Sequence, residues 1–285
     1  MNVLITGGTG FLGSRLASAW KSRGHRVAVT SSGTGVPPPG ALRFRLGEPF
    51  DGRALEGIVC VVHGAHAFGG GTHVLNVEGT RALFIAARAA GVRHQVFISS
   101  ASAQAAGASA YGRVKRAVEP LFLDAGETVV RPGLVLGRGG MFGRVMDRVL
   151  SSPVIPLLAG GEDLVPVVAE ADFVAAMTEV LEGGLRGSWN LVSGEQVTMR
   201  RLLGTLARLA GRRRLFVPVP TAAAERLLSG MERLGIPFPV GADSVRSIAG
   251  ARRAPPPASD LPRLIGAATP LEEALAAALG PRPPR

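Results

Sequence analysis

One tyrosine and one lysine, Tyr111 and Lys115, stand four residues apart in the middle of the chain. On a helix this spacing places both side chains on one face, about one turn apart. A free tyrosine has a pKa near ~10 and is a poor base at neutral pH. A neighbouring ammonium stabilises the phenolate and lowers that pKa. The pair therefore predicts acid/base chemistry in which Tyr111, the only tyrosine in the sequence, moves a proton.

A serine-rich segment lies just before this pair. The apolar run Val96 to Ile98 is typical of a buried strand, and Ser99, Ser100 and Ser102 follow it. A hydroxyl from the end of this strand could hold a substrate oxygen while Tyr111 moves its proton. Tyrosine and lysine occur at this spacing in many helices, so the hypothesis depends on what else the chain brings to the site.

A glycine-rich turn at the N-terminus supplies that context. An apolar strand, Val3 to Ile5, is followed by Gly7, Gly10 and Gly13 and then by a helical pattern. The first glycine permits a sharp turn, the second lets the backbone approach a pyrophosphate, and the third lets the helix pack closely on the sheet. The helix N-terminus presents unpaired N–H groups to the phosphates. We therefore expect a dinucleotide here, and its cationic nicotinamide would further favour the Tyr111 phenolate.

The end of the next strand bears on which dinucleotide binds. A site for NAD usually carries an acidic residue about 20 residues after the glycine turn, where it accepts bonds from the ribose hydroxyls. Here the strand Arg26 to Thr30 ends instead in Thr30, Ser31 and Ser32, whose hydroxyls could bind a 2′-phosphate. The sequence therefore favours NADP over NAD. In the alternative interpretation the two serines only open the loop that follows.

The remaining patterns predict an α/β fold. Further strands are expected at Arg43 to Leu46, Ile58 to Val62 and Gly187 to Leu191, and a helix from Asn76 to Arg88. We expect a Rossmann-type doubly wound parallel sheet, with residues 1–150 as the NAD(P)-binding domain. Residues 151–285 would form a small C-terminal substrate lobe and the return strands of the sheet.

Composition limits the partners. The chain has 285 residues, of which 46% are hydrophobic, enough for a packed core. The net charge of +11 favours anionic partners, but the basic residues are scattered and the dense run Arg212 to Arg214 is interpreted as a solvated turn. We find no nucleic-acid recognition module and no apolar stretch of the ~20 residues needed to span a membrane. No leader segment precedes the first strand, so we expect a cytoplasmic protein.

Cysteine and histidine chemistry is not expected. Cys60 lies within an apolar run, has no partner for a disulfide, and is predicted to be a buried thiol. His63, His66 and His73 cluster in sequence, but no matching Cys, Asp or Glu ligands lie nearby. We therefore expect no metal site.

The order of the motifs resembles the short-chain dehydrogenase/reductase superfamily, in its extended and atypical, NAD-dependent epimerase/dehydratase-like branches. The segments that carry the resemblance are Thr6 to Gly13, Asn76 to Thr80, Phe97 to Ser100, Tyr111 to Lys115 and Val130 to Gly133. Asp243 to Val245, Leu264 to Gly266 and Pro270 to Glu273 are similar to atypical members akin to the NADPH-binding accessory subunit of respiratory complex I.

The resemblance implies roles for individual residues. Ser100 would be the catalytic hydroxyl, and Ser99 and Ser102 are the alternatives for that role. Ser99 would also lie near the cofactor. Tyr111 would be the acid/base, and Lys115 would bind the nicotinamide ribose and tune Tyr111. The remaining cofactor contacts that the family implies are Gly7, Gly10, Phe11, Leu12, Gly13, Asn76, Pro132 and Gly133.

Two departures from the family pattern matter. Only eleven positions separate Ser100 from Tyr111, where sugar epimerases carry a longer insertion, which weakens the prediction of nucleotide-sugar chemistry. Pro120 falls in the continuing helix, where it removes a backbone N–H and predicts a kink beyond Lys115.

The second half of the chain predicts mostly helices. Met141 to Leu150 has core spacing, and Phe142 and Met146 could line a substrate pocket, although packing on the domain is the commoner role. Asp172 and Thr198 are expected as N-caps of two helices. Further predicted elements are a helix from Phe173 to Glu182, a helix from Thr198 to Leu209, a strand at Leu215 to Pro220, and helices at Thr221 to Leu234 and Leu271 to Leu279.

Two functions from different classes remain open. The first is an NAD(P)-dependent oxidoreductase or epimerase that acts on a small-molecule alcohol or carbonyl through Ser100, Tyr111 and Lys115. The second is a non-catalytic NADPH-binding structural or assembly protein, attached peripherally to a membrane complex by its basic surface. The intact tyrosine and lysine pair favours the enzyme. A homodimer is compatible with either.

Overall fold

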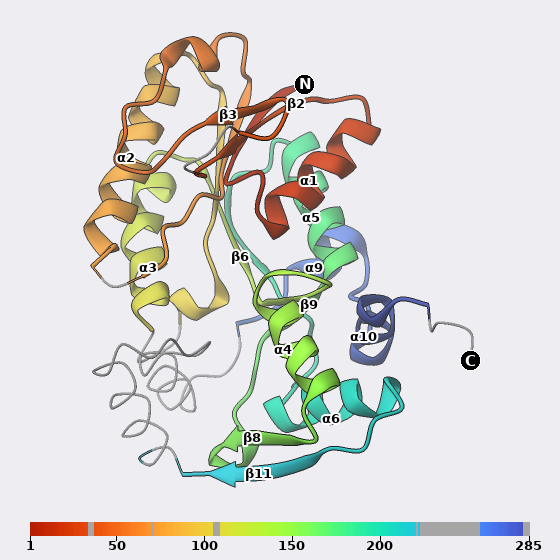
Figure 1. The fold of residues 1–285 in the computed structure, drawn as a ribbon. Helices are drawn as coiled ribbons and strands as arrows, with labels where there is room; N and C mark the ends of the chain where they lie inside the picture. The colour runs from red at the N-terminus through yellow and green to blue at the C-terminus, as the bar shows by residue number, and fades with distance from the viewer. Residues whose placement is uncertain (34–36, 70, 105–108, 221, 223–256, 282–285) are drawn as a thin grey trace. The chain divides into compact units, whose positions relative to one another are not determined.

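The computed structural model describes residues 1–33, 37–69, 71–104, 109–220, 222 and 257–281 (Figure 1). Two compact units can be distinguished in it. The first comprises Met1–Ser100, Val114–Arg131 and Phe173–Trp189, and the second comprises Ala101–Arg113, Pro132–Asp172 and Asn190–Arg285. The chain passes between the units several times, so each unit is built from segments that are distant in sequence.

A seven-stranded sheet organises the first unit. Its strand order is β10-β6-β5-β4-β1-β2-β3, and the five pairings from β6 to β3 are parallel. The order reverses beside β1, which is where ligands bind in sheets of this kind. The strands are β1 (Asn2–Thr6), β2 (Arg26–Ser31), β3 (Ala41–Arg43), β4 (Cys60–His63), β5 (His94–Ile98), β6 (Thr128–Pro132) and β10 (Gly187–Leu191).

Helices cover both faces of this sheet, which confirms the predicted doubly wound α/β fold. In Figure 1, α1 (Phe11–Ser22) and α5 (Glu170–Glu182) lie on one face, and α2 (His73–Ala89) and α3 (Ala110–Leu123) lie on the other. Trp20 of α1 donates to the Thr178 hydroxyl of α5 at 3.0 Å. Phe84 and Phe97 both pack on the ring of Phe122, with centroids 4.8 and 5.1 Å from it. These buried contacts hold the helices on the strands.

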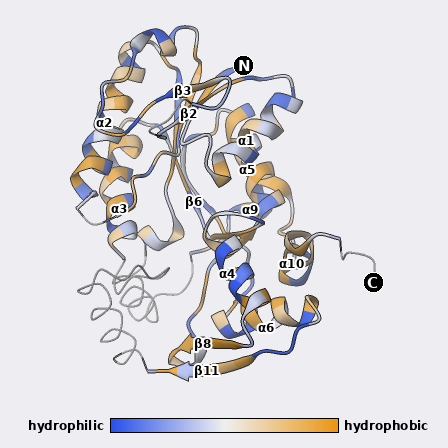
Figure 2. Cartoon of the chain, viewed as in Figure 1, coloured by the Kyte–Doolittle hydropathy of each residue, from blue (hydrophilic) through white to orange (hydrophobic). Residues whose placement is uncertain are grey.

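The second unit has its own apolar core. Phe142, Leu202 and Leu275 are fully buried in one cluster, and Met146 is 5% exposed in it. Figure 2 shows the largely apolar β8 and β11 and several hydrophilic residues on α4. The elements are β7 (Leu134–Leu136), α4 (Gly140–Ser151), β8 (Val154–Leu158), β9 (Val167–Ala169), α6 (Met199–Leu209), β11 (Leu215–Val219), α9 (Leu261–Ile265) and α10 (Leu271–Leu279).

Among the described residues, short 3₁₀ turns are formed by Gly52–Leu55, Ala101–Ala103 and Ala159–Gly161. No helix of the described residues is both long enough and apolar enough to cross a membrane. The predicted helix at 221–234, apart from Ala222, and the segment 243–245 lie outside the described residues.

Several predicted boundaries were wrong. The third strand is Ala41–Arg43, because this edge strand has β2 as its partner and ends where Phe44 turns into a cluster with Leu55. The helix expected from Asn76 begins at His73. Asp172 lies inside α5 and is no N-cap, since its carboxylate instead accepts the backbone N–H and the hydroxyl of Thr269.

Two local predictions were confirmed. Thr198 caps α6, because its hydroxyl accepts the Arg201 N–H at 3.1 Å. Phe142 and Met146 pack into the core of the second unit.

The run 212–214 is more than the solvated turn that was predicted, since Arg214 donates to the carbonyls of Val149 and Leu150 at the end of α4.

Candidate functional site

The glycine turn after β1 is shaped by backbone contacts that leave no room for side chains. Gly7 has a φ of +66°, which only glycine adopts readily. A Cβ atom added at Gly7 would lie 2.9 Å from the Gly64 carbonyl oxygen, and one added at Gly13 would lie 2.6 Å from the Gly7 oxygen. The sharp turn and the close packing of α1 predicted at these two positions are therefore confirmed.

Gly8 was not among the predicted residues, yet it is equally constrained. A Cβ at Gly8 would lie 2.5 Å from the Cβ of Val29 on the neighbouring strand β2. Gly10 is the N-cap residue of α1, and Phe11 and Leu12 are the first two residues of that helix. The N–H groups of this first turn have no partners within the helix, which suits them to bind an anion.

Two threonines fix the positions of the loops around this turn. The Thr30 hydroxyl accepts the Gly7 N–H at 3.1 Å. The Thr6 hydroxyl accepts the N–H groups of Gly64 and Ala65 at 3.2 and 3.3 Å. The ends of β1, β2 and β4 are therefore held together by hydroxyl groups. Thr30, predicted as a cofactor contact, supports the turn through this bond and is only 1% exposed.

Ser31 and Ser32 lie at the end of β2, beside an arginine that ends the neighbouring strand β3. Ser31 is half-buried and Ser32 is exposed. In the parallel register, Ser31 pairs with Arg43 of the edge strand β3, and Arg43 is exposed. Partners in register on neighbouring strands project to the same side of a sheet. Sequence analysis missed Arg43, because only the strand pairing brings it beside Ser31.

Asn76 forms hydrogen bonds that hold the loop that follows β4. Its side-chain oxygen accepts the Ala67 N–H at 2.8 Å, and its amide donates to the carbonyls of Ala67 and Thr72 at 2.9 and 2.8 Å. The side chain is 2% exposed. Asn76 therefore shapes the loop that starts at Gly64, which is held against the glycine turn.

Lys115 lies buried at the end of β5. Its ammonium donates to the Ile98 carbonyl at 2.8 Å and lies 4.8 Å from the centre of the Phe97 ring. The residue is 3% exposed. Burial lowers the Lys115 pKa to about 7, while the negative charge of Glu119 acts to raise it. This lysine can therefore change its charge near neutral pH.

Tyr111 lies one helical turn before Lys115 on α3 and is partly exposed. Its surroundings raise the pKa of the phenol to about 12 by burial. This direction is opposite to the lowering that we predicted from the lysine and the cofactor. In the protein alone, desolvation of the phenolate is the stronger effect, so Tyr111 is protonated at neutral pH.

The three serines differ in their surroundings. Ser99 is 1% exposed, and its hydroxyl donates to the Glu119 carboxylate at 2.5 Å. Ser100 is half-buried at the end of the first unit, and Ser102 lies in a 3₁₀ turn of the second unit. Ser99 is therefore engaged with Glu119, and Ser100, which directly follows it, is less buried.

A buried ion pair lies behind Lys115 and was not predicted. Arg131 of β6 donates from Nε and a terminal nitrogen to both oxygens of Glu119, at 2.9 and 2.7 Å. The side chains are 10% and 9% exposed. Glu119 follows Lys115 by four residues on α3, a spacing visible in the sequence, but the partner Arg131 could be found only from the fold.

The histidines and the cysteine near the site are electrically neutral groups. Burial lowers the pKa values of His63 and His66 to about 4, and the Lys115 charge contributes at His66. His63 Nε2 bonds the Gln95 side chain at 2.8 Å. Cys60 is buried as predicted, and burial raises its pKa to about 12. Within the described part of the chain, no three His, Cys, Asp or Glu residues are arranged to hold a metal ion.

Pro132 is the last residue of β6 and Gly133 follows it, and both belong to the second unit. The Gly133 N–H donates to the Leu191 carbonyl at 3.0 Å. A Cβ at Gly133 would lie 2.6 Å from the Pro166 oxygen, so only glycine fits there. The family-derived cofactor role of this pair stays a prediction.

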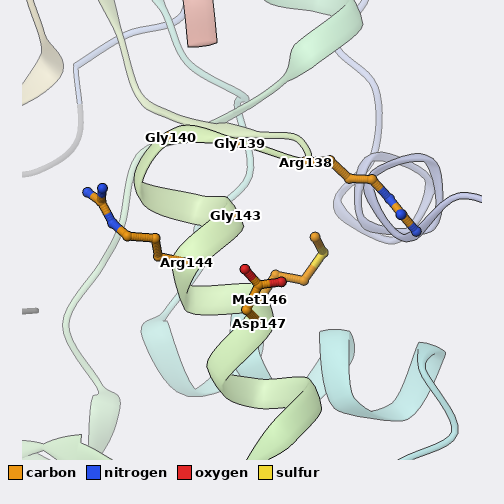
Figure 3. A pocket seen from close by; sticks show the side chains of 7 residues that line it. All are labelled: Arg138, Gly139, Gly140, Gly143, Arg144, Met146 and Asp147. Atoms are coloured by element: carbon orange, nitrogen blue, oxygen red, sulfur yellow. The ribbon is translucent and has the colours of Figure 1, made fainter. Parts of the chain in front are cut away.

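A cavity of about 520 Å³ opens at the start of α4, lined by Arg138, Gly139, Gly140, Gly143, Arg144, Met146 and Asp147. Its two guanidinium groups do not converge (Figure 3). Arg138 reaches the end of α10, where it donates to the carbonyls of Ala278 and Leu279. Arg144 points to the opposite side in Figure 3. The cavity therefore lacks the converging polar groups of a ligand site.

Comparison with known proteins identifies relatives. A model described as the NAD dependent epimerase/dehydratase family matches residues 3–191. The chain is 31% identical over 277 residues to sterol demethylase protein B of Methylococcus capsulatus, covering 84% of this chain and 82% of that protein. It is 33% identical over 178 residues to a ceramide reductase of Caulobacter vibrioides, covering 55% of this chain and 54% of that protein.

A solved structure agrees with the fold. MoeE5 in complex with UDP-glucuronic acid and NAD superposes with a TM-score of 0.75 at 23% identity, over 98% of this chain and 97% of that one. At this identity the likeness concerns the fold alone. The family match favours an enzyme over the non-catalytic cofactor-binding protein considered from sequence.

Proposed function

The chain belongs to the NAD dependent epimerase/dehydratase family, and we propose from this premise that it is an NAD(P)-dependent oxidoreductase of an alcohol or ketone. The observation that carries the proposal is the buried Lys115 ammonium, fixed at the end of β5 one helical turn from Tyr111. In this proposal Tyr111 gives a proton to the carbonyl oxygen, Ser100 holds that oxygen, and Lys115 binds the ribose.

The cofactor supplies the hydride, and the residues around the glycine turn suit a dinucleotide. The turn brings the backbone close to the first turn of α1, where the phosphates would bind. We propose that Arg43 and Ser31 bind the 2′-phosphate of NADP, because an exposed guanidinium stands in register with a hydroxyl. NAD would bind at the same turn without these two contacts.

The protonation states suit reduction better than oxidation. The Tyr111 pKa of about 12 keeps the phenol protonated at neutral pH, so it is ready to donate. The positive charge of Lys115, present below its pKa of about 7, favours the phenolate left after the transfer. For this cycle we expect the rate of reduction to fall as the pH rises above about 7, because Lys115 loses its charge.

We propose an apolar, lipid-sized ketone as the substrate. Two relatives are named for a sterol and for a ceramide, and the first is similar over most of both chains. The short spacing between Ser100 and Tyr111 argues against the alternative of a nucleotide sugar.

The test is a substrate screen with the purified protein. Sterol ketones, long-chain keto lipids and UDP-sugars are each mixed with NADPH or NADH, and loss of the nicotinamide absorbance is followed. We expect turnover with NADPH and a lipid ketone, and a fall in kcat of about 10²-fold or more for Tyr111→Phe at unchanged cofactor affinity.

Two results would overturn parts of the proposal. Equal turnover by Tyr111→Phe would exclude this residue as the acid. Tight NADPH binding with no turnover of any class, in both wild type and variant, would favour the structural role instead.

A further inference from the structure

Four groups behind the proposed active site form one buried network. Glu119 accepts three bonds, from the Ser99 hydroxyl at 2.5 Å and from two nitrogens of Arg131 at 2.9 and 2.7 Å. Lys115 precedes Glu119 by one turn of α3 and bonds the carbonyl of Ile98, the residue before Ser99. Consecutive residues at the end of β5 therefore hold consecutive turns of α3.

We propose that Glu119 and Arg131 form a positioning pair that sets the location and the charge of Lys115. The inference rests on the proposed function in so far as Lys115 takes part in catalysis. Neither residue of the pair is proposed to touch the substrate. They would act through the lysine.

Geometry gives the first argument. The guanidinium of Arg131 binds both carboxylate oxygens in the two-pronged arrangement that fixes orientation as well as distance. This arrangement ties α3 to β6, and the Ser99 hydroxyl ties it to β5. Because Pro120 follows Glu119 directly and cannot supply a helical N–H, side-chain bonds are needed to hold the helix at this point.

Charge gives the second argument. The charged and titratable groups around Lys115 are Glu119 on its own helix, His66 on the loop after β4, Arg131 paired with Glu119, and Tyr111 one turn earlier. Among these groups Glu119 is the anion, and its charge opposes the effect of burial on Lys115. Arg131 partly neutralises Glu119, so the pair sets how much negative charge Lys115 experiences.

The sequence offers an unusually direct measurement. Lys21 and Lys115 are its only lysines. With carbon-13 at the lysine Cε position, an NMR spectrum contains two lysine signals, and Lys21→Arg assigns them. Lys21 is exposed and serves as the internal reference. The titration needs neither cofactor nor substrate.

The two partners are predicted to act in opposite directions. Glu119→Gln removes the anion, so we expect the Lys115 pKa to fall by about one unit. Arg131→Met removes the cation that neutralises Glu119, so we expect the Lys115 pKa to rise. Glu119→Asp keeps the charge and should stay closer to wild type than Glu119→Gln.

A second glutamate–arginine pair, in which Glu127 is buried and Arg186 is exposed, provides the control. Glu127 accepts the Gln95 N–H at 2.8 Å and pairs with Arg186, at the opposite ends of β5 and β6. Glu127→Gln should lower stability without moving the Lys115 signal. If a single variant of the network fails to fold, the double variant Glu119→Gln/Arg131→Met removes both charges of the pair together, so that neither partner is left buried without the other, and it should still lower the Lys115 pKa.

An unchanged Lys115 titration in Glu119→Gln and in the double variant would overturn the inference, as would a shift of equal size in Glu127→Gln. In the active enzyme, Glu119→Gln should move the loss of kcat at high pH to a lower pH. A failed substrate screen would count against the proposed function and leave the NMR result as the separate test of the pair.

Discussion

At the scale of single residues, partners distant in sequence decide what each side chain does. Thr30, predicted to contact the cofactor, supports the Gly7 turn, and its cofactor contact stays a prediction. Ser99, an alternative catalytic hydroxyl, bonds Glu119. The types and spacing of residues in the sequence could nominate these positions, but hydroxyl groups at strand ends have several available partners, and the fold selects among them.

Arg43 gives the first residue-scale prediction. Replacing it with Gln should weaken NADPH binding about tenfold, since a charge-assisted bond to the 2′-phosphate is lost. NADH affinity should not change. The measurement is calorimetric titration with each cofactor, and Arg53→Gln, at an exposed arginine paired with Asp51, is the control. Equal weakening of both cofactors would show that Arg43 does not recognise the phosphate.

Ser100 gives the second residue-scale prediction. Ser100→Ala should lower kcat about 10²-fold, because the donor that holds the substrate oxygen is removed, while cofactor affinity stays the same. Steady-state kinetics with the substrate found by screening is the measurement. Ser102→Ala is the matched variant, and a larger loss there than at Ser100 would reassign the hydroxyl role.

At the scale of elements, the sequence predicted the strands of the sheet better than their ends. Apolar runs identified β1, β4 and β5, because burial on both faces requires continuous apolar residues. The predicted limits of the edge strand β3 were wrong, since an edge strand has one neighbour and its limits depend on that pairing. The predicted start of α2 was wrong: the N-cap is Thr72, a residue type that favours this position, although its hydroxyl bonds the Gly69 carbonyl and makes no capping bond to the helix.

A closely packed glycine, Gly13, and a glycine with open space around it, Gly204, provide a prediction at this scale. A methyl group at Gly13 would meet the Gly7 backbone at 2.6 Å, so Gly13→Ala should destabilise the fold and abolish cofactor binding. At Gly204, inside α6, a Cβ would have no neighbour within 4 Å. Gly204→Ala should therefore stabilise the protein by about 0.5 to 1 kcal/mol.

Thermal unfolding of the two variants measures the difference. We expect a lower Tm for Gly13→Ala and a higher one for Gly204→Ala. A Gly13→Ala protein with wild-type Tm and wild-type NADPH affinity would contradict the packing argument for the turn.

At the scale of the whole molecule, the sequence predicted the fold class and the family, because both depend on the order of motifs along the chain. It could not predict the Glu119–Arg131 pair, which depends on how α3 packs on β6, or the place of Arg43, which depends on the pairing of β2 with β3. It also misjudged the Tyr111 pKa, because desolvation depends on how much protein surrounds the phenol.

Buried histidines make the stability of the whole chain depend on pH. His63, His66 and His94 have pKa values lowered by burial from 6.5 to about 4. Between these values the unfolded chain binds more protons than the folded protein, so stability falls as the pH is lowered from 6.5 towards 4. Between pH 7 and pH 5 we expect a loss of about 2 kcal/mol or more.

Urea unfolding at the two pH values tests this expectation. His63→Asn should reduce the difference in the free energy of unfolding between pH 7 and pH 5, while the exposed His73→Asn should leave it unchanged. Equal stability of the wild type at both pH values would show that these histidines are protonated in the folded state.

The central claim is that hydride passes between the nicotinamide and a substrate carbon with Tyr111 as the proton donor. The most direct measurement is mass spectrometry of the product formed from a lipid ketone and NADPH carrying deuterium at the transferred position. We predict one deuterium on the new alcohol carbon in the wild type and almost no labelled product from Tyr111→Phe. An unlabelled product, or equal labelling by Tyr111→Phe, would contradict the account.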